Sequence, residues 1–287
     1  MRWSCAVIIA GALAGCAVSE GNREEAQRLL KVGRVLRERE DFGGAARAFA
    51  AAINRDPSFG RAHMELGVEY LRYGLRLEDA AAAFARAATL DSSLWEASQY
   101  RVFALYELGD KKGALAAQKA LVEREPGRAE AHQNQGDLLL KERRWEEAER
   151  CYRKALELKS PYPLARGGLG IALWRNGRVE EGLVHLRAAT ADLPERVSLR
   201  LELARALLAH DLPAEAAAEA EAARQLEPDN GLVYHILAEI RIAQGDRAGA
   251  AAMAREARAR RYGLSGELRA KLDGDAMAET GDTGGSP

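Results

Sequence analysis

A period of 34 residues runs through most of this 287-residue chain and restricts what it can fold into. Small residues recur at one place of successive repeats, at Gly33, Gly67, Gly136, Gly170, Ala204 and Ala238, with Val102 in the remaining position. A second small-residue series keeps the same spacing, at Ala45, Ala80, Ala114, Ala148, Gly182, Ala216 and Ala250. One extra residue falls between Gly67 and Val102. A fixed period of this length predicts a solenoid of repeated supersecondary elements.

Each repeat is predicted to contain two short helices. In residues 26–59, apolar residues follow helical spacing, stop at Glu40 and Asp41, and resume before Pro57. Later repeats close in the same way on a turn former or helix breaker, at Ser92, Pro126, Ser160, Pro194 and Pro228, and the last ends on Tyr262. Because helices of about 12 to 14 residues cannot bury an apolar stripe alone, neighbouring repeats must stack on one another.

The residues at fixed places of each repeat resemble the tetratricopeptide repeat. The first repeat begins at residue 26 and the fifth at residue 163, and the places of each repeat are numbered from its own first residue. The places 4, 7, 8, 11, 20, 24, 27 and 32 of repeat five hold Arg166, Leu169, Gly170, Leu173, Gly182, Leu186, Ala189 and Pro194. The resemblance implies an all-α fold, a right-handed α-solenoid of about seven helix-turn-helix repeats with a short C-terminal capping helix. Two copies depart from the pattern: repeat three at Arg101, Val102 and Gln118, and repeat seven at Arg241, Ala254 and Tyr262.

The repeats divide the chain into a few segments. We expect a signal peptide at residues 1–15, a lipid-anchored tether at 16–25, a capping helix at 265–272 and a disordered tail at 273–287. The solenoid between them covers 26–264, with repeats at 26–59, 60–94, 95–128, 129–162, 163–196, 197–230 and 231–264. Since a repeat array grows in one dimension, we count it as one domain.

Composition and charge agree with a soluble helical body. Hydrophobic residues make up 47% of the chain and charged residues 30%, and the formal net charge is −1. Because positive and negative charges are nearly equal in number, the chain as a whole does not attract a polyanion such as nucleic acid, and no nucleic-acid partner is expected.

The N-terminus carries an export signal. Arg2 precedes an apolar run from Trp3 to Ala12 that is too short to span a membrane, followed by Leu13-Ala14-Gly15-Cys16. This last motif resembles the bacterial lipobox, which implies cleavage before Cys16 and lipidation of that cysteine. Two alternatives remain open at this stage: an ordinary cleaved signal with an incidental cysteine, and a retained short anchor.

The lipobox resemblance also suggests a location. In that family an Asp after the cysteine retains lipoproteins in the inner membrane, whereas residue 17 here is Ala. We therefore expect the periplasmic face of the outer membrane, with the inner membrane or cell surface as alternatives. Cys151 would be the single thiol left free, and we predict that it is a small, partly buried packing residue.

A peptide-binding surface is predicted from the family pattern, in which places 2, 5, 9, 12 and 13 of each first helix line a concave groove. The candidate groove residues are Arg61, Met64, Val68, Arg72, Gln99, Phe103, Tyr106, Gln133, Asp137, Ile171, Trp174, Leu201, Arg205 and His235. An apolar lining with scattered arginines suits an amphipathic helix or an extended apolar peptide. The alternative is that single side chains of this set only pack against neighbouring helices. The Lys and Asn clamp of chaperone-binding members is missing, because repeat one offers Leu30 and Arg34 at places 5 and 9.

Catalytic and metal-binding patterns are not found. The five histidines show no metal-ligand spacing, and His63 and His132 at place 4 are predicted packing residues. The run from Gly167 to Gly170 lacks the Lys-Ser/Thr of a phosphate loop. We therefore predict no enzyme activity, no cofactor and no metal.

A basic cluster closes the last repeat, with Arg255, Arg258, Arg260 and Arg261. The plain interpretation is a solvated final helix, and the alternative is contact with anionic lipid or a polyanionic polymer.

Two classes of function follow from the sequence. The first is a lipid-anchored periplasmic adaptor that binds a peptide or helix of an envelope assembly machine, similar to pilotin lipoproteins, Tad-type pilus assembly lipoproteins or exopolysaccharide-export lipoproteins. The alternative is an accessory that recruits cell-wall hydrolases or outer-membrane and polysaccharide-export components. The sequence specifies neither the partner nor the oligomeric state.

Overall fold

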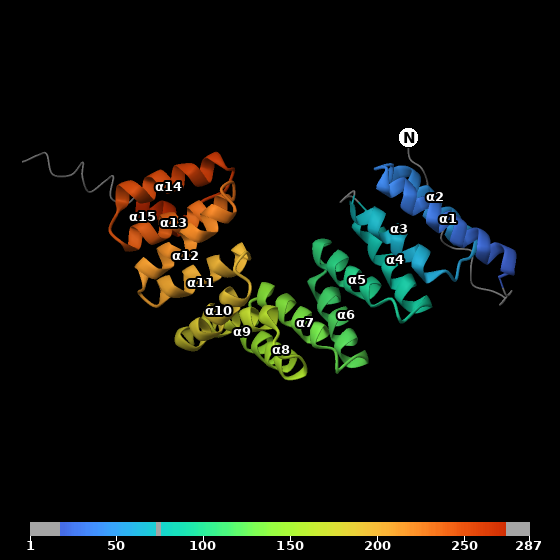
Figure 1. The fold of residues 1–287 in the computed structure, drawn as a ribbon, viewed down its shortest axis with the longest axis horizontal. Helices are drawn as coiled ribbons and strands as arrows, with labels where there is room; N and C mark the ends of the chain where they lie inside the picture. The colour runs from blue at the N-terminus through green and yellow to red at the C-terminus, as the bar shows by residue number, and fades with distance from the viewer. Residues whose placement is uncertain (1–17, 73–75, 274–287) are drawn as a thin grey trace, which may run out of the picture. The chain divides into compact units, whose positions relative to one another are not determined.

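A computed structural model describes residues 18–72 and 76–273, so Cys16, the predicted signal peptide and most of the predicted tail lie outside the described residues. Within these ranges the chain forms fifteen α-helices and no strand (Figure 1), which confirms the all-α prediction. None of the described helices is both long enough and apolar enough to cross a membrane.

The described residues form two compact units, and the division between them falls between Leu121 and Val122. Unit 1 contains α1 (Glu20–Glu38), α2 (Phe42–Arg55), α3 (Gly60–Arg72), α4 (Leu77–Leu90), α5 (Trp95–Glu107) and most of α6 (Lys111–Arg124). Unit 2 contains α7 (Ala129–Lys141), α8 (Trp145–Leu158), α9 (Pro163–Arg175), α10 (Val179–Asp192), α11 (Val197–Ala209), α12 (Pro213–Leu226), α13 (Gly231–Ala243), α14 (Arg247–Ala259) and α15 (Gly266–Asp273). The boundary falls inside α6, in the repeat whose sequence departs from the pattern at places 7, 8 and 24.

The helices keep the sequence period closely. From α3 to α13, every first helix of a repeat occupies places 1–13, and most second helices occupy places 17–30. The extra residue of repeat two falls between α3 and α4, which are separated by four residues where the other pairs have three. In six of the repeats the turn between the paired helices has a left-handed residue at place 15, which is Gly109, Gly177 or Gly245 in three of them. Glycine takes this conformation without steric cost. Glu40, Arg143 and Asp211 adopt it in three others.

Small residues at the predicted places let the paired helices approach closely. An added Cβ at Gly33, Gly67 or Gly136 would lie 2.4 to 2.8 Å from the ring of an aromatic residue on the second helix, namely Phe49, Phe84 and Tyr152. These three rings are fully buried. Glycine at this place therefore makes room for the large side chain that fills each helix pair.

Unit 1 holds a cluster of ion pairs between its first two repeats. Glu65 accepts hydrogen bonds from Arg34 at 2.6 Å and from Arg37 at 2.8 Å, and Arg37 also reaches the fully buried Glu69 at 2.5 Å. Burial acts to raise the pKa of Glu65, but the hydrogen bonds from the two arginines outweigh it and lower that pKa below its ordinary value. The negative charge of Glu65 is thus part of the contact between α1 and α3.

Helix α1 begins earlier than the repeat pattern predicts. Ser19 caps it by accepting the backbone N–H of Asn22, and the helix starts at Glu20 instead of residue 26. The second half of the predicted tether is therefore helical, which corrects that boundary. Val32 and Val35 of α1 are about half exposed.

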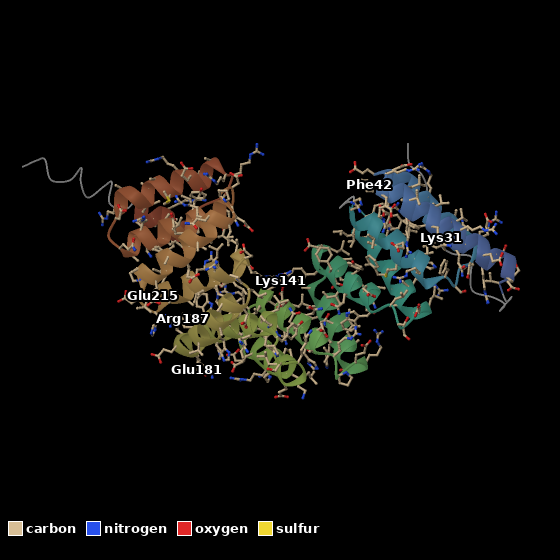
Figure 2. All side chains as sticks on the ribbon, viewed as in Figure 1. Lys31, Phe42, Lys141, Glu181, Arg187 and Glu215 are labelled. Carbon is tan, nitrogen blue, oxygen red and sulfur yellow. The ribbon has the colours of Figure 1, made fainter. Side chains whose placement is uncertain are left out.

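A recurring hydrogen bond links successive repeats. Where a repeat closes on proline, the residue at place 4 of the next repeat bonds to that proline's carbonyl oxygen: His63 to Pro57, His132 to Pro126, Arg200 to Pro194 and Tyr234 to Pro228, at 2.8 to 3.1 Å. The two histidines are therefore structural, as predicted. On the surface of unit 2, Arg187 of α10 and Glu215 of α12 pair at 2.7 Å between repeats (Figure 2).

Candidate functional site

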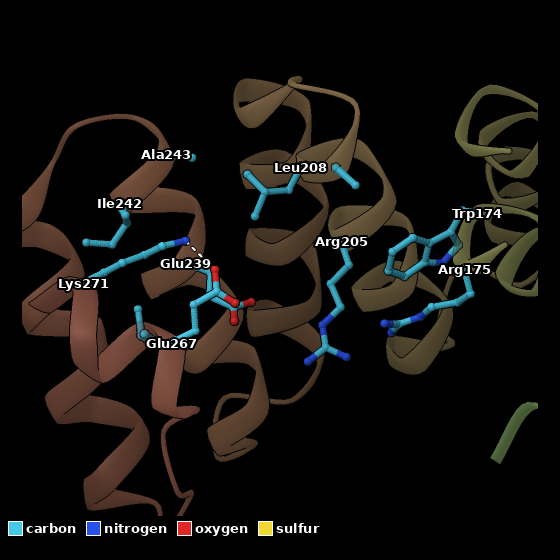
Figure 3. Close-up of a pocket in the computed structure, with 11 residues that line it drawn as sticks. Trp174, Arg175, Arg205, Leu208, Glu239, Ile242, Ala243, Glu267 and Lys271 are labelled. Carbon is cyan, nitrogen blue, oxygen red and sulfur yellow. Dashed lines mark hydrogen bonds and ion pairs between the residues drawn. The ribbon is translucent and has the colours of Figure 1, made fainter. Parts of the chain in front are cut away.

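Unit 2 contains a hollow of about 530 Å³ between the C-terminal ends of three first helices and the last helix (Figure 3). We call it the α9–α15 hollow. Its lining consists of Trp174 and Arg175 from α9, Arg205, Leu208 and Ala209 from α11, Glu239, Ile242 and Ala243 from α13, and Glu267, Leu268 and Lys271 from α15. The residues of α9, α11 and α13 all occupy places 9, 12 or 13 of their repeats, three of the places predicted to face a ligand.

Helix α15 closes one side of this hollow. It lies where an eighth repeat would begin, and its Leu268 is almost completely buried against α13 and α14, together with Leu264 of the preceding turn. The short helix expected at 265–272 therefore contributes lining as well as covering the last repeat. Sequence reasoning missed Glu267, Leu268 and Lys271 as site residues, because the 34-residue period extended by one helix puts them at places 3, 4 and 7, which are not among the predicted lining places.

Trp174 is the largest apolar group of the lining. It is half-buried, and the Arg175 guanidinium lies 3.9 Å from its ring centroid, a cation–π contact. In repeat five both small-residue places are glycine, and an added Cβ at Gly182 would lie 2.9 Å from the backbone nitrogen of Trp174. The close approach of α9 and α10 thus fixes the backbone that carries this indole.

The charged groups of the hollow are paired unevenly. Arg175 and Arg205 both contact one carboxylate, Glu202, at 3.1 and 3.4 Å. On the other side, Glu267 pairs with Lys271 at 2.7 Å and Glu239 contacts His235 at 3.1 Å. Most of these side chains stay partly exposed, so a ligand can reach them.

A second hollow, of about 650 Å³, lies at the N-terminal ends of α11 and α13. Leu193, Arg196, Ser198, Leu201 and Leu232 are among its lining residues. Leu201 is one helical turn from Arg205 on α11, so the two hollows lie along one face of that helix.

The predicted groove residues of unit 2 divide into lining and packing groups. Trp174 and Arg205 line the α9–α15 hollow, Ile171 packs against the core, and Trp174 contacts that core as well. Leu201 is 3% exposed and His235 is 4% exposed, with the His235 ring 5.4 Å from that of Tyr262. For His235 the packing alternative is therefore the better description.

Gln133 and Asp137 belong to a polar network instead. Asp137 accepts a hydrogen bond from the Tyr152 hydroxyl at 2.6 Å and another from Gln133, which itself accepts from Tyr162 at 3.1 Å. The surrounding protein raises the pKa of Asp137 by desolvation, despite these hydrogen bonds.

The predicted groove residues of unit 1 lie on α3 and α5. Arg61 and Arg72 are exposed, the latter with its guanidinium 4.1 Å from the Phe42 ring centroid, and Phe103 is 49% exposed. Val68, Gln99 and Tyr106 are half-buried, and Met64 is buried and packs in the core.

Two other predicted features can be placed. Cys151 is half-buried, and desolvation raises the pKa of its thiol to about 11, consistent with a packing role. In the basic cluster, Arg260 is held by the Pro228 carbonyl at 2.9 Å and by Glu256, while the other three arginines are exposed. Among residues 18–72 and 76–273, no three His, Cys, Asp or Glu side chains gather in a way that would hold a metal ion.

Comparison with known proteins identifies the class of fold and then the family. A sequence profile described as tetratricopeptide repeat matches residues 30–94, 101–163, 134–194 and 168–231, and the chain belongs to this family. Its members are typically protein-interaction scaffolds. No curated protein sequence matches the chain significantly.

Solved structures show the same fold. A tetratricopeptide repeat protein from Parabacteroides merdae is 21% identical over 87% of this chain and 98% of its own, with a TM-score of 0.71. A chain of the APC/C hetero-tetramer Cut9–Hcn1 is 14% identical over 88% of this chain and 46% of its own, with a TM-score of 0.68. A MamA fragment from Desulfovibrio magneticus RS-1 is 17% identical over 63% of this chain and 99% of its own, with a TM-score of 0.52.

Proposed function

We propose that this protein is a lipid-anchored scaffold of the bacterial envelope whose α9–α15 hollow binds a segment of a partner protein from an assembly machine such as a pilus or secretion apparatus. The observation that carries the binding part is the composition of the hollow. Trp174, Leu208 and Ile242 provide an apolar floor, and Arg175, Arg205 and Glu239 stand beside it. Aromatic and arginine side chains in a partly desolvated hollow are typical binding anchors.

The location rests on the sequence. Leu13-Ala14-Gly15-Cys16 supports lipidation of Cys16, and Ala17 supports the periplasmic face of the outer membrane. With α1 beginning at Glu20, only residues 17–19 separate the proposed anchor from the first helix, and the four steps from Cys16 to Glu20 span at most about 14 Å. An anchored scaffold would therefore be held against the bilayer, where envelope machines assemble.

Site-specific photocrosslinking in cells tests the binding surface. A photoreactive residue at position 174 should capture a discrete envelope protein, because this side chain contributes to the floor of the hollow. The same residue at position 184 is the matched control, since Val184 is 67% exposed on α10 and lies outside the hollow. Capture of the same set of proteins from both positions would contradict the proposal.

Metabolic labelling tests the anchor. Wild-type protein should incorporate a fatty-acid probe and the Cys16→Ser variant should not, because the thioether to the lipid needs the cysteine sulfur. A Cys151→Ser variant should label like wild type. Labelling that persists in Cys16→Ser would show that the anchor is elsewhere.

A further inference from the structure

The α9–α15 hollow has charged sides of opposite sign. Arg175 and Arg205 share the single carboxylate of Glu202, so the α9–α11 side carries one positive charge in excess. Figure 3 shows the two guanidinium groups on the same side of the hollow. The contacts to Glu202 leave about a third of each arginine side chain exposed, so a second carboxylate can approach both arginines.

The α13–α15 side has the opposite excess. Glu239 and Glu267 lie near each other in Figure 3, and Lys271 provides one positive charge between them through its pair with Glu267. Two carboxylates and one ammonium group give this side one negative charge in excess. A basic side chain is therefore favoured at this end and an acidic side chain is disfavoured.

A row of apolar groups runs beside the charged groups, from α9 through α11 to α13. Trp174, Leu208 and Ile242 occupy place 12 of three successive repeats. Packed helices lie about 8 to 10 Å apart, so this row extends over about 20 Å, the length of about 13 helical residues. An extended peptide would depend on side chains or water for its backbone hydrogen bonds, because the carbonyl oxygens of Trp174, Leu208 and Ile242 already accept from the turns that follow each helix. A helical ligand satisfies its own backbone.

From this arrangement we infer that the hollow binds a short amphipathic helix that is apolar along one face and oppositely charged at its two ends. The acidic end lies over α9–α11 and the basic end lies over α13–α15. The inference rests on the proposed peptide-binding role and adds the chemistry and direction of the ligand. Because acidic residues stabilise a helix N-terminus and basic residues its C-terminus, the ligand helix runs from α9 towards α15.

Three synthetic peptides of about 14 residues test this inference. They share one leucine pattern and differ in charge: one has Glu in the first turn and Lys in the last, one has Glu at both ends, and one has Lys at both ends. Binding to the full chain is measured by fluorescence anisotropy at low and high salt. The Glu/Lys peptide should bind several-fold more tightly than either other peptide, and high salt should reduce the difference.

Charge reversal at each side gives the sharper result. Arg205→Glu should weaken binding of the Glu/Lys peptide and of the peptide with Glu at both ends, and strengthen binding of the peptide with Lys at both ends. Glu239→Lys should weaken binding of the Glu/Lys peptide and of the peptide with Lys at both ends, and strengthen binding of the peptide with Glu at both ends. Arg224→Glu is the matched control, because Arg224 lies on α12 outside the hollow. Circular dichroism of each variant checks that it is folded.

The outcomes separate the two proposals. If all three peptides bind equally and neither reversal changes their order, the charge inference is wrong while peptide binding stands. If none of the three peptides binds either wild type or the Trp174→Ala variant, both the inference and the proposed binding role of the hollow are overturned.

Discussion

Replacing Gly182 with alanine should destabilise unit 2 and displace its main aromatic anchor. The added Cβ would lie 2.8 Å from the carbonyl oxygen of Gly170 and 2.9 Å from both the backbone nitrogen and the Cβ of Trp174. Because none of these atoms can move by a rotamer change, α9 and α10 must separate. Overpacking of this kind costs up to about 3 kcal/mol, and the higher helix propensity of alanine returns about 1 kcal/mol. We expect a net loss of about 2 kcal/mol.

Urea unfolding followed by far-UV circular dichroism measures this loss. The matched control is Gly21→Ala, since Gly21 lies in α1 with no atom within 4 Å of an added Cβ. That variant should gain up to about 1 kcal/mol, because alanine loses less conformational freedom in a helix. A Gly182→Ala variant as stable as wild type would refute the argument that both small-residue places of repeat five must lack a side chain.

Three further predictions follow from burial and charge. Leu169→Ala should lower the free energy of unfolding in urea by about 2 to 5 kcal/mol, because Leu169 is 3% exposed. Val32→Ala, at the same place of repeat one, should lower it by less than about 0.5 kcal/mol, because Val32 is 49% exposed. Equal losses in the two variants would contradict this contrast. The pKa of Glu65 is lowered in the folded state, so its stabilising contribution is complete above the ordinary value of 4.5 and is lost as the pH falls through the folded value. Melting temperatures between pH 3 and pH 7 should therefore fall less steeply in acid for Glu65→Gln than for wild type, and parallel curves would refute the assignment. Cys151, whose pKa is raised to about 11, should react with a maleimide at pH 8 far more slowly in folded than in urea-unfolded protein, as read by mass spectrometry of its peptide; equal rates would contradict the buried environment.

The 34-residue period predicted the helices well because the same places of each repeat make the same contacts between paired helices. Gly33 and Gly136 show this directly, since each makes room for an aromatic ring sixteen residues later. The same logic explains why Gln118, a polar residue at a core place of repeat three, is completely buried. The start of α1 was predicted six residues too late because it depends on the Ser19 cap, a local feature outside the repeat.

The site was harder to predict, because the family pattern gives the face of a helix but not what covers it. His235 occupies a lining place yet is buried beside Tyr262, a residue specific to the last repeat. Conversely, Lys271 lines the hollow from a helix that lies beyond the last repeat. Both differences arise at the end of the array, where a capping segment replaces the next repeat.

The most direct test of the central claim is the affinity of the captured partner segment for the purified protein. Once crosslinking from position 174 identifies that segment, its binding is compared in wild type, Trp174→Ala and Val184→Ala. Loss of a buried aromatic anchor costs 2 kcal/mol or more at binding hot spots, so we predict at least a 20-fold weaker Kd for Trp174→Ala, by roughly 1.4 kcal/mol for each tenfold, and an unchanged Kd for Val184→Ala. Equal affinity for all three proteins would show that the α9–α15 hollow is not the binding site.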